Sequence, residues 1–268
     1  MDETTKIIRD FYDSQVEFEW NRIAGRPEFL LTCRMFDRYI KAGDKVLDIG
    51  GGPGRYSCYL SGKGCEVTLF DLSPENVKFA KEKAAEQNLP LKAVCGDARM
   101  ADKIINENDK FDHVLLMGPM YHLLEESDRI TAVNAALNLL KPGGLIYISF
   151  ISMNGGLVFL SRECPELIIL PDEERFITPL VAGGNYAGKA FTQAFFINQN
   201  EILPFMSQFC LEKLHVFGQE SILAPNERNI MGQSPEVVAF WLDLAEKMWE
   251  KEEYLSWSEH LMYVGRKN

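Results

Sequence analysis

The hydrophobic and polar positions of the chain follow two alternating periods over most of its first 150 residues. Helical patterns predict one helix from the turn after residue 54 to about residue 60 and further helices over 73–87 and 125–140. Short apolar runs between them predict strands at 45–49, 65–70, 91–95, 111–117 and 145–151. Strands that alternate with helices at this spacing predict an α/β fold with a doubly wound, mostly parallel sheet.

The two ends of the chain depart from this alternation. Residues 4–23 predict one amphipathic helix, and a second helix begins at Pro27, a residue typical of the first helical position, and ends near Ile40. Residues 152–190 contain two Gly-Gly pairs and no clean period, so we expect an irregular insertion there. Later elements are predicted as strands at 191–197, 211–217 and 261–265 and as helices at 200–208 and 235–252.

These patterns predict one domain over residues 1–268. We divide it into N-terminal cap helices, a ligand-binding half of the sheet, an inserted lid and the C-terminal part of the sheet. The corresponding ranges are 1–41, 42–151, 152–190 and 191–268.

The first predicted strand ends in a glycine-rich turn, Val46-Leu47-Asp48-Ile49-Gly50-Gly51-Gly52-Pro53-Gly54. Glycines at the point where a buried strand enters a helix let a ligand approach the backbone closely. The dinucleotide-binding fingerprint requires glycines at relative positions one, three and six. Counting from Gly50 places Arg55 sixth, and counting from Gly51 places Pro53 third, so the fingerprint fails in both registers. Asp48 would repel a pyrophosphate and attract a cationic ligand.

This turn closely resembles the first motif of the class I S-adenosylmethionine-dependent methyltransferases, and the chain resembles the members that act on small molecules. S-adenosylmethionine carries an ammonium and a sulfonium group, which suit an acid at position 48. The resemblance implies a Rossmann-like, seven-stranded sheet whose last two strands form an antiparallel pair at the edge. It also implies S-adenosyl-L-methionine as the cofactor.

The resemblance assigns roles to residues at the strand ends. Asp71 is expected to accept the ribose hydroxyls, although an acid there also suits the start of the following helix. Asp97 is expected to accept from the adenine amine, or else to stabilise a turn. Tyr12 and Arg22 either contact the ligand or pack in the core. The full set of expected cofactor contacts is Tyr12, Arg22, Asp48, Gly50, Gly51, Gly52, Gly54, Asp71, Leu72, Asp97, Ala98 and Met117.

The fourth strand ends in Met117-Gly118-Pro119-Met120-Tyr121-His122, which we expect to face the transferred methyl group. His122 is a candidate general base and alternatively a packing or capping residue. Tyr121 is a candidate for orienting the substrate, or a packing residue. The segment is also similar to the Asn/Asp-Pro-Pro-Tyr sequence of enzymes that methylate base or glutamine amines. Gly118 stands where those enzymes place the side chain that holds the amine, which argues against such substrates.

Composition narrows the function further. The net charge of −11 and the absence of a Lys/Arg cluster argue against a nucleic-acid partner. The first residues lack the pattern of a signal peptide, and no apolar run is long enough to cross a membrane, so we expect a cytoplasmic protein without a membrane partner. Six scattered cysteines without a close pair predict reduced thiols and no metal site.

The predicted function is methyl transfer to an oxygen, nitrogen or carbon nucleophile of a small molecule. Gly183–Lys189 either closes over this acceptor or forms a surface loop. Two alternatives remain open: a non-catalytic protein that binds S-adenosylmethionine or S-adenosylhomocysteine, and a nicotinamide-dependent oxidoreductase, which the glycine register disfavours. The sequence identifies neither the acceptor nor the oligomeric state.

Overall fold

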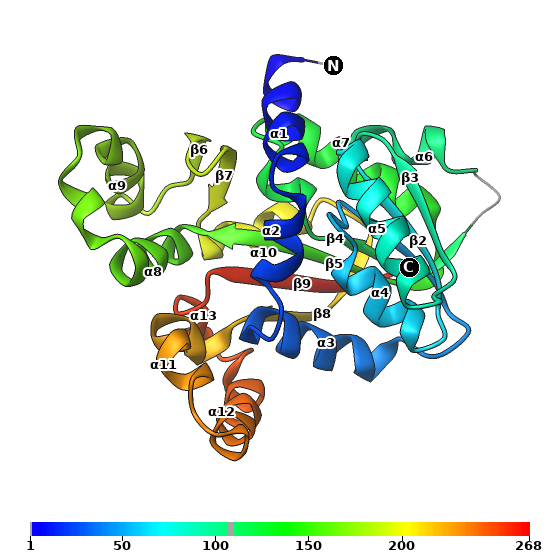
Figure 1. The fold of residues 1–268 in the computed structure, drawn as a ribbon. Helices are drawn as coiled ribbons and strands as arrows, with labels where there is room; N and C mark the ends of the chain where they lie inside the picture. Colours follow the sequence, from blue (N-terminus) through cyan, green and yellow to red (C-terminus); the bar gives the residue numbers. More distant parts are fainter. Residues whose placement is uncertain (1, 107–109) are drawn as a thin grey trace.

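The computed structural model describes residues 2–106 and 110–268 and has the predicted α/β architecture (Figure 1). In the described residues, one sheet contains nine strands. They are β1 (Lys45–Ile49), β2 (Glu66–Asp71), β3 (Leu91–Cys95), β4 (Phe111–Leu116), β5 (Leu140–Ser152), β6 (Tyr186–Lys189), β7 (Gln193–Ile197), β8 (Leu211–Gly218) and β9 (His260–Lys267).

Five strands run parallel in the order β3-β2-β1-β4-β5, and β9 and β8 continue the sheet with antiparallel pairing. These seven strands form the predicted sheet. The β6–β7 hairpin is an addition, because β7 pairs with β5 only at the last two residues of β5. The strand order reverses between β1 and β4, and open parallel sheets bind ligands at such a switch point.

Helices cover both faces of the sheet. The helices are α1 (Glu3–Asp13), α2 (Val16–Arg22), α3 (Pro27–Tyr39), α4 (Arg55–Gly62), α5 (Pro74–Glu86), α6 (Ala101–Ile104), α7 (Glu126–Leu139), α8 (Met153–Glu163), α9 (Glu174–Val181), α10 (Gln199–Met206), α11 (Glu227–Met231), α12 (Pro235–Met248) and α13 (Glu252–Leu255). Short 3₁₀ helices are η1 (Ala98–Met100), η2 (Pro119–Tyr121), η3 (Pro165–Ile169), η4 (Pro171–Glu173) and η5 (Ser221–Asn226). No helix within these described ranges is long and apolar enough to cross a bilayer.

The core has two layers because the central strands bury both of their faces. Val46 of β1 joins a cluster with α3, α4 and α12, whereas Leu47 and Ile49 join the cluster under α7 and α10. This alternation follows the period of two along a strand. In Figure 1, α8, α9 and the β6–β7 hairpin lie together at one end of the sheet, and α12 projects below it.

The prediction of one helix over residues 4–23 is wrong, since α1 and α2 are separate. The backbone N–H of Ser14 donates to the Asp10 carbonyl, and the Ser14 hydroxyl donates to the Phe11 carbonyl at 2.7 Å. Gln15 then leaves the helical conformation, with φ −130° and ψ 21°. A serine side chain that bonds a nearby carbonyl competes with helix continuation. In Figure 1, α2 follows below α1 as a separate helix.

The prediction of an irregular insertion at 152–190 is also wrong, because it contains α8, α9 and β6. Two glycines in α8 weaken the helical signal. A Cβ on Gly155 would lie 2.5 Å from the Glu259 carbonyl oxygen, and one on Gly156 would clash with the Phe176 ring. Both positions therefore require glycine for close packing, at the cost of helix propensity.

Strand β5 begins five residues earlier than expected. The turn-forming residues Lys141–Gly144 lie within it, at a place where the pairing with β4 shifts register between Phe111 and His113. A bulge of this kind keeps turn residues within a strand, which the alternation of side chains does not reveal.

Candidate active site

A cleft lies at the carboxyl ends of the parallel strands, beneath the N-terminal helices. Helix α1 contacts α5 on one side and β7 on the other, so it crosses the switch point (Figure 1). The empty space within the cleft, counted out to its mouth, is about 1250 Å³. The predicted site residues that line it are Tyr12, Arg22, Asp48, Gly50, Gly51, Gly52, Asp71, Leu72, Asp97, Ala98, Met117, Tyr121 and His122.

Gly54 and the insertion do not line this cleft. Gly54 has φ +88°, and a Cβ there would lie 2.9 Å from the Ala80 Cβ, so this glycine lets α4 approach α5. Within the described residues, none from 152–190 reaches the cleft, and Tyr186–Lys189 pairs with β7 as strand β6. Gly54 therefore has a packing role at the end of the turn, and the expected contact of Gly183–Lys189 with the acceptor has no counterpart in this conformation.

The glycine turn packs directly against the loop after β4. Gly50 has φ +75°, and a Cβ there would clash with the ring of Pro119. A Cβ on Gly118 would lie 2.8 Å from the Gly50 carbonyl oxygen. A side chain at either position would push the two turns apart, which explains why position 118 carries no amine-holding side chain.

Asp48 lies beneath the turn, almost fully buried, and accepts a 2.7 Å hydrogen bond from the Ser57 hydroxyl. A Cβ on Gly51 would lie 2.7 Å from Asp48 Oδ2, so the glycine leaves this oxygen room. Burial raises the pKa of Asp48 to about 7. Near neutral pH this carboxyl group is therefore partly protonated, and a cation bound beside it would favour the charged form.

Asp71 accepts three hydrogen bonds at the end of β2. Gly52 N–H donates to Oδ2 at 2.8 Å, while Ser73 N–H and Asn76 Nδ2 donate to Oδ1 at 2.9 and 3.2 Å. Burial raises the pKa of Asp71 although these bonds oppose the shift. A carboxylate has about four acceptor positions, so Oδ2 retains one for a ligand hydroxyl. The two roles expected for this acid are compatible, because Asp71 also binds Ser73, the N-cap residue of α5, and the Asn76 side chain in its first turn.

Asp97 is held by a residue that the sequence analysis missed. Arg99 contacts both carboxylate oxygens, with Nε 3.0 Å from Oδ1 and Nη2 2.5 Å from Oδ2. The same guanidinium donates to Asp128 at 2.8 Å and to the Thr5 hydroxyl at 3.0 Å. Arg99 thus ties α1 and α7 to η1, and an adenine amine would share Asp97 with it. No local motif marks Arg99, because two of its partners, Asp128 and Thr5, lie 29 and 94 positions away in the sequence.

Arg22 brings a positive charge to the cleft. Its Nε lies 2.9 Å from Glu19 and its Nη1 lies 3.3 Å from the buried Glu28. A guanidinium has five N–H groups, so N–H groups remain for an anionic part of a ligand. Glu28, Ser149 and Gln219 also line the cleft and were not predicted.

His122 and Tyr12 form a hydrogen-bonded pair at the end of β4. The Tyr12 hydroxyl lies 2.6 Å from His122 Nε2, and His122 Nδ1 lies 3.0 Å from the Gln193 carbonyl oxygen. Burial lowers the pKa of His122 to about 4, so the imidazole is neutral at pH 7. The Tyr121 ring packs edge-on against His122, with 4.9 Å between ring centroids.

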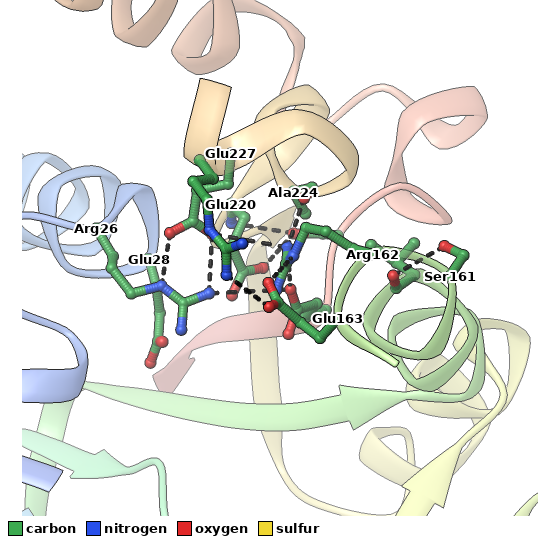
Figure 2. Close-up of polar contacts among 12 residues, drawn as sticks. Arg26, Glu28, Ser161, Arg162, Glu163, Glu220, Ala224 and Glu227 are labelled. Carbon is green, nitrogen blue, oxygen red and sulfur yellow. Dashed lines mark hydrogen bonds and ion pairs between the residues drawn. The ribbon is translucent and has the colours of Figure 1, made fainter. Parts of the chain in front are cut away.

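A buried polar network adjoins the cleft (Figure 2). Glu220 accepts from His260 Nδ1 at 2.7 Å, from the Ser258 hydroxyl at 2.7 Å and from the His260 N–H at 3.0 Å. Although burial opposes both shifts, their mutual attraction lowers the pKa of Glu220 to about 2 and raises that of His260 to about 9. The pair is therefore ionic at neutral pH.

The rest of this network consists of arginine–glutamate pairs. Arg162 contacts Glu259 at 2.6 Å, and Arg26 contacts Glu227 at 2.6 and 2.8 Å. In the described part of the chain, Glu28, Glu220 and His260 are grouped closely enough to hold a cation. Both Glu220 oxygens already accept from protein donors, and Glu28 faces the Arg22 guanidinium. These contacts make the group an ion-pair network rather than a metal site.

Comparison with known proteins places this geometry in a family. A family profile described as "Methyltransferase domain" matches residues 46–144. The chain is 27% identical to the ubiquinone biosynthesis O-methyltransferase of Chromobacterium violaceum, over 68% of this chain and 78% of that protein. It is 32% identical to the protein of that name from Cereibacter sphaeroides, over 54% of this chain and 60% of that protein. The matches to several of these relatives cover less than two thirds of the relative's length.

Solved structures agree on the fold. Magnesium protoporphyrin IX methyltransferase from Synechocystis PCC 6803, with bound S-adenosylhomocysteine, has a TM-score of 0.60 at 14% identity over 99% of this chain and 100% of that one. The PH0226 protein from Pyrococcus horikoshii has a TM-score of 0.56 at 19% identity over 92% of this chain and 90% of that one. The glycine turn, the acids at the strand ends and these matches together favour a methyltransferase over a nicotinamide-dependent enzyme. Residues 46–144 therefore match a methyltransferase domain, and the fold around them is similar to that of solved methyltransferases that bind S-adenosylmethionine or its product.

Proposed function

We propose that this protein transfers a methyl group from S-adenosylmethionine to a hydroxyl group of a small molecule. The observation that carries the proposal is the neutral Tyr12–His122 pair, which lines the same cleft as the glycine turn and Asp71. The names of the relatives, which specify O-methylation, support it.

The proposed cofactor contacts follow from charge and hydrogen-bonding capacity. The Arg22 guanidinium is proposed to bind the carboxylate of the methionine part of the cofactor. The glycine turn lets this part of the cofactor approach the backbone closely. Asp71 suits a ribose hydroxyl through the acceptor position left on Oδ2. Asp97 and the backbone N–H of Ala98 suit the adenine edge. When bound, the sulfonium supplies a methyl group that is already activated, so the protein's task is alignment, exclusion of water and removal of a proton.

A hydroxyl acceptor fits the protein groups better than an amine. An alkyl amine is protonated at neutral pH, and His122, whose pKa is about 4, is too weak a base to remove that proton before attack. A hydroxyl loses its proton only as the methyl group is transferred, when its oxygen becomes strongly acidic. Even a weak base accepts a proton at that stage.

The proposal is tested by binding and by turnover. Calorimetry should show binding of S-adenosylmethionine and S-adenosylhomocysteine but not of nicotinamide dinucleotides. Incubation with labelled S-adenosylmethionine and catechol, 4-nitrocatechol or 4-hydroxybenzoate should then yield methyl ethers, identified by mass spectrometry. Benzylamine and benzoate, which have no hydroxyl group, should yield no methylated product. Cofactor binding without transfer to any acceptor would favour the non-catalytic alternative. Methylation of benzylamine but of no hydroxyl would contradict the proposed acceptor class.

The sequence-based predictions on context remain proposals. We place the enzyme in the cytoplasm and expect neither a nucleic-acid nor a membrane partner. Residues 1–41 act as a cap over the cofactor in this proposal, because α1 and α2 contribute Tyr12 and Arg22 to the cleft. Residues 152–190 are proposed as a lid that reaches the cleft only when the acceptor is bound.

A further inference from the structure

We propose that Tyr12, on the N-terminal helix α1, is a catalytic residue that takes the proton of the acceptor hydroxyl and passes its own proton to His122. This inference rests on the proposed O-methylation and deepens it. It differs from direct deprotonation by His122, which the sequence alone suggests.

The direction of the hydrogen bonds follows from the chemistry of the three groups. A carbonyl oxygen only accepts, so the Gln193 carbonyl, 3.0 Å away, requires the proton of the neutral imidazole to lie on Nδ1. Nε2 is then an acceptor, and the Tyr12 hydroxyl at 2.6 Å must donate to it. The lone pairs of the Tyr12 oxygen remain for a donor in the cleft. A hydroxyl acceptor provides such a donor, whereas a carboxylate acceptor does not.

The packing around His122 leaves Tyr12 as the group through which a proton from the acceptor reaches the imidazole. His122 is 8% exposed, and both of its ring nitrogens are already hydrogen-bonded. Three aromatic rings pack around it, with centroid distances of 5.2 Å to Tyr12, 4.9 Å to Tyr121 and 5.8 Å to Phe191. An acceptor that reached Nε2 directly would have to displace the Tyr12 hydroxyl.

The proposed step balances without a further reactant. The acceptor oxygen forms a bond to the methyl carbon while the bond between that carbon and sulfur breaks, and its electron pair stays on sulfur. The acceptor's proton moves to the Tyr12 oxygen, and the Tyr12 proton moves to His122 Nε2. The positive charge thus passes from the sulfonium to the imidazole. Burial disfavours the imidazolium, so His122 returns the proton through Tyr12 to water once the product leaves.

Tyr12 makes the docking of α1 a condition for chemistry. Helix α1 is held by the Arg99–Thr5 hydrogen bond, by the Ser73–Asp13 hydrogen bond and by the contact between Phe11 and Phe191. A displaced α1 would leave His122 without its link to the acceptor. The cap therefore supplies part of the reaction and not only a cover.

The kinetic test compares Tyr12→Phe with Tyr39→Phe. Tyr39 is a matched control, because its hydroxyl also lies 2.6 Å from a histidine Nε2, that of His215, away from the cleft. Catechol needs the relay at pH 8, whereas 4-nitrocatechol is already ionised there. Tyr12→Phe should lower kcat about 100-fold with catechol, within the range of general base catalysis, and less than about 5-fold with 4-nitrocatechol. The Kd of S-adenosylhomocysteine should change less than about 3-fold, and Tyr39→Phe should change neither rate.

Further variants separate the two routes for the proton. His122→Asn should show the same loss with catechol as Tyr12→Phe, and the double variant should lose no more, because groups that act as one unit are not additive. A Tyr12→Phe enzyme with full catechol activity would overturn the relay in favour of direct deprotonation. Equal losses with both acceptors would show that Tyr12 only positions the substrate.

Nitrogen NMR gives a readout that does not depend on turnover. The chain has four histidines, so the signals of His122 in the complex with S-adenosylhomocysteine can be assigned by comparison with His122→Asn. We expect a proton on Nδ1 and none on Nε2 at pH 7, with a shift of the Nε2 signal in Tyr12→Phe. A proton on Nε2 would overturn the relay. Failure of the wild type to methylate any hydroxyl would instead contradict the proposed function, while the NMR result still decides the hydrogen-bond direction.

Discussion

The exchange of Glu220 for glutamine tests whether the buried ion pair beside the cleft stabilises the C-terminal part of the sheet (Figure 2). Glu220 is fully buried before η5, and its partner His260 begins β9. Glutamine has nearly the same volume but a single acceptor oxygen. Its NH₂ group would face either the Ser258 hydroxyl or the imidazole, which are the donors that the carboxylate now binds.

The expected loss follows from the pKa of His260. Although burial opposes it, the charge of Glu220 helps to raise this pKa from 6.5 to about 9, which corresponds to about 3 kcal/mol at about 1.4 kcal/mol for each pKa unit. The pKa of Glu220 falls by a similar amount, from 4.5 to about 2, as expected for one shared interaction. Breaking a buried pair by removing one partner costs about 3–5 kcal/mol, so we expect Glu220→Gln to lose about 3 kcal/mol.

The sign of the pH dependence follows from both groups. The contribution of His260 is complete below pH 6.5 and is lost as pH rises through about 9, while that of Glu220 is present above pH 4.5 and lost as pH falls toward 2. The penalty of Glu220→Gln is therefore largest near pH 5–6 and small at pH 10. Glu28 and Glu259 also face His260, so they favour its protonated form in the variant as well. The positive charge of Arg162, which pairs with Glu259, weakens this effect.

Urea unfolding followed by tryptophan fluorescence at pH 6 and pH 10 measures this difference. The control is Glu212→Gln, which removes an exposed pair with Arg266 and should cost less than about 1 kcal/mol at either pH. At pH 6 we also expect the Tm of Glu220→Gln to fall by about 6–12 °C. A loss below about 1 kcal/mol at pH 6, or an equal loss at both pH values, would refute this account of the network.

Three further variants test the cleft. Asp71→Asn leaves one acceptor oxygen for the donors of Gly52, Ser73 and Asn76. The Kd of S-adenosylhomocysteine, measured by calorimetry, should therefore rise about 10- to 100-fold. An unchanged Kd would contradict the ribose role of Asp71. Gly118→Asn places a Cβ 2.8 Å from the Gly50 carbonyl oxygen, so we expect a Tm several degrees lower and weaker cofactor binding. An unchanged Tm and an unchanged cofactor affinity would show that the two turns separate easily. If Gly183–Lys189 closes over the acceptor, Tyr186→Ala should raise the KM for catechol several-fold at unchanged cofactor Kd, and an unchanged KM would rule out that contact.

The position of the site and its acidic residues can be predicted from short stretches of the sequence. The apolar run before Gly50 and the acids after β2 and β3 lie on successive parallel strands, so their side chains have to meet at one edge of the sheet. The register of the glycines distinguishes two cofactor classes without any tertiary contact. These features depend on neighbours in sequence and on a strand period of two, which a single chain displays directly.

The contacts that complete the site depend on residues far apart in sequence. Tyr12 and His122 are separated by 110 positions, and Glu220 and His260 by 40. Neither pair has a local signal, because a hydrogen bond between distant segments leaves no period in the chain. The pKa of His122 also depends on burial by α1 and β7, which only the packed fold provides.

The helices at 152–190 also could not be predicted from the sequence, because their packing depends on distant residues. Gly155 and Gly156 weaken the helical pattern of α8, yet each is required where the Glu259 backbone or the Phe176 ring approaches. Sequence by itself determined the fold class and the edge of the sheet where the site lies, since these follow from periodicity and turn chemistry, and its resemblance to a known family implied the cofactor. Only the tertiary structure decided which polar groups meet there and in which protonation state, because partner choice and desolvation arise from contacts between distant segments.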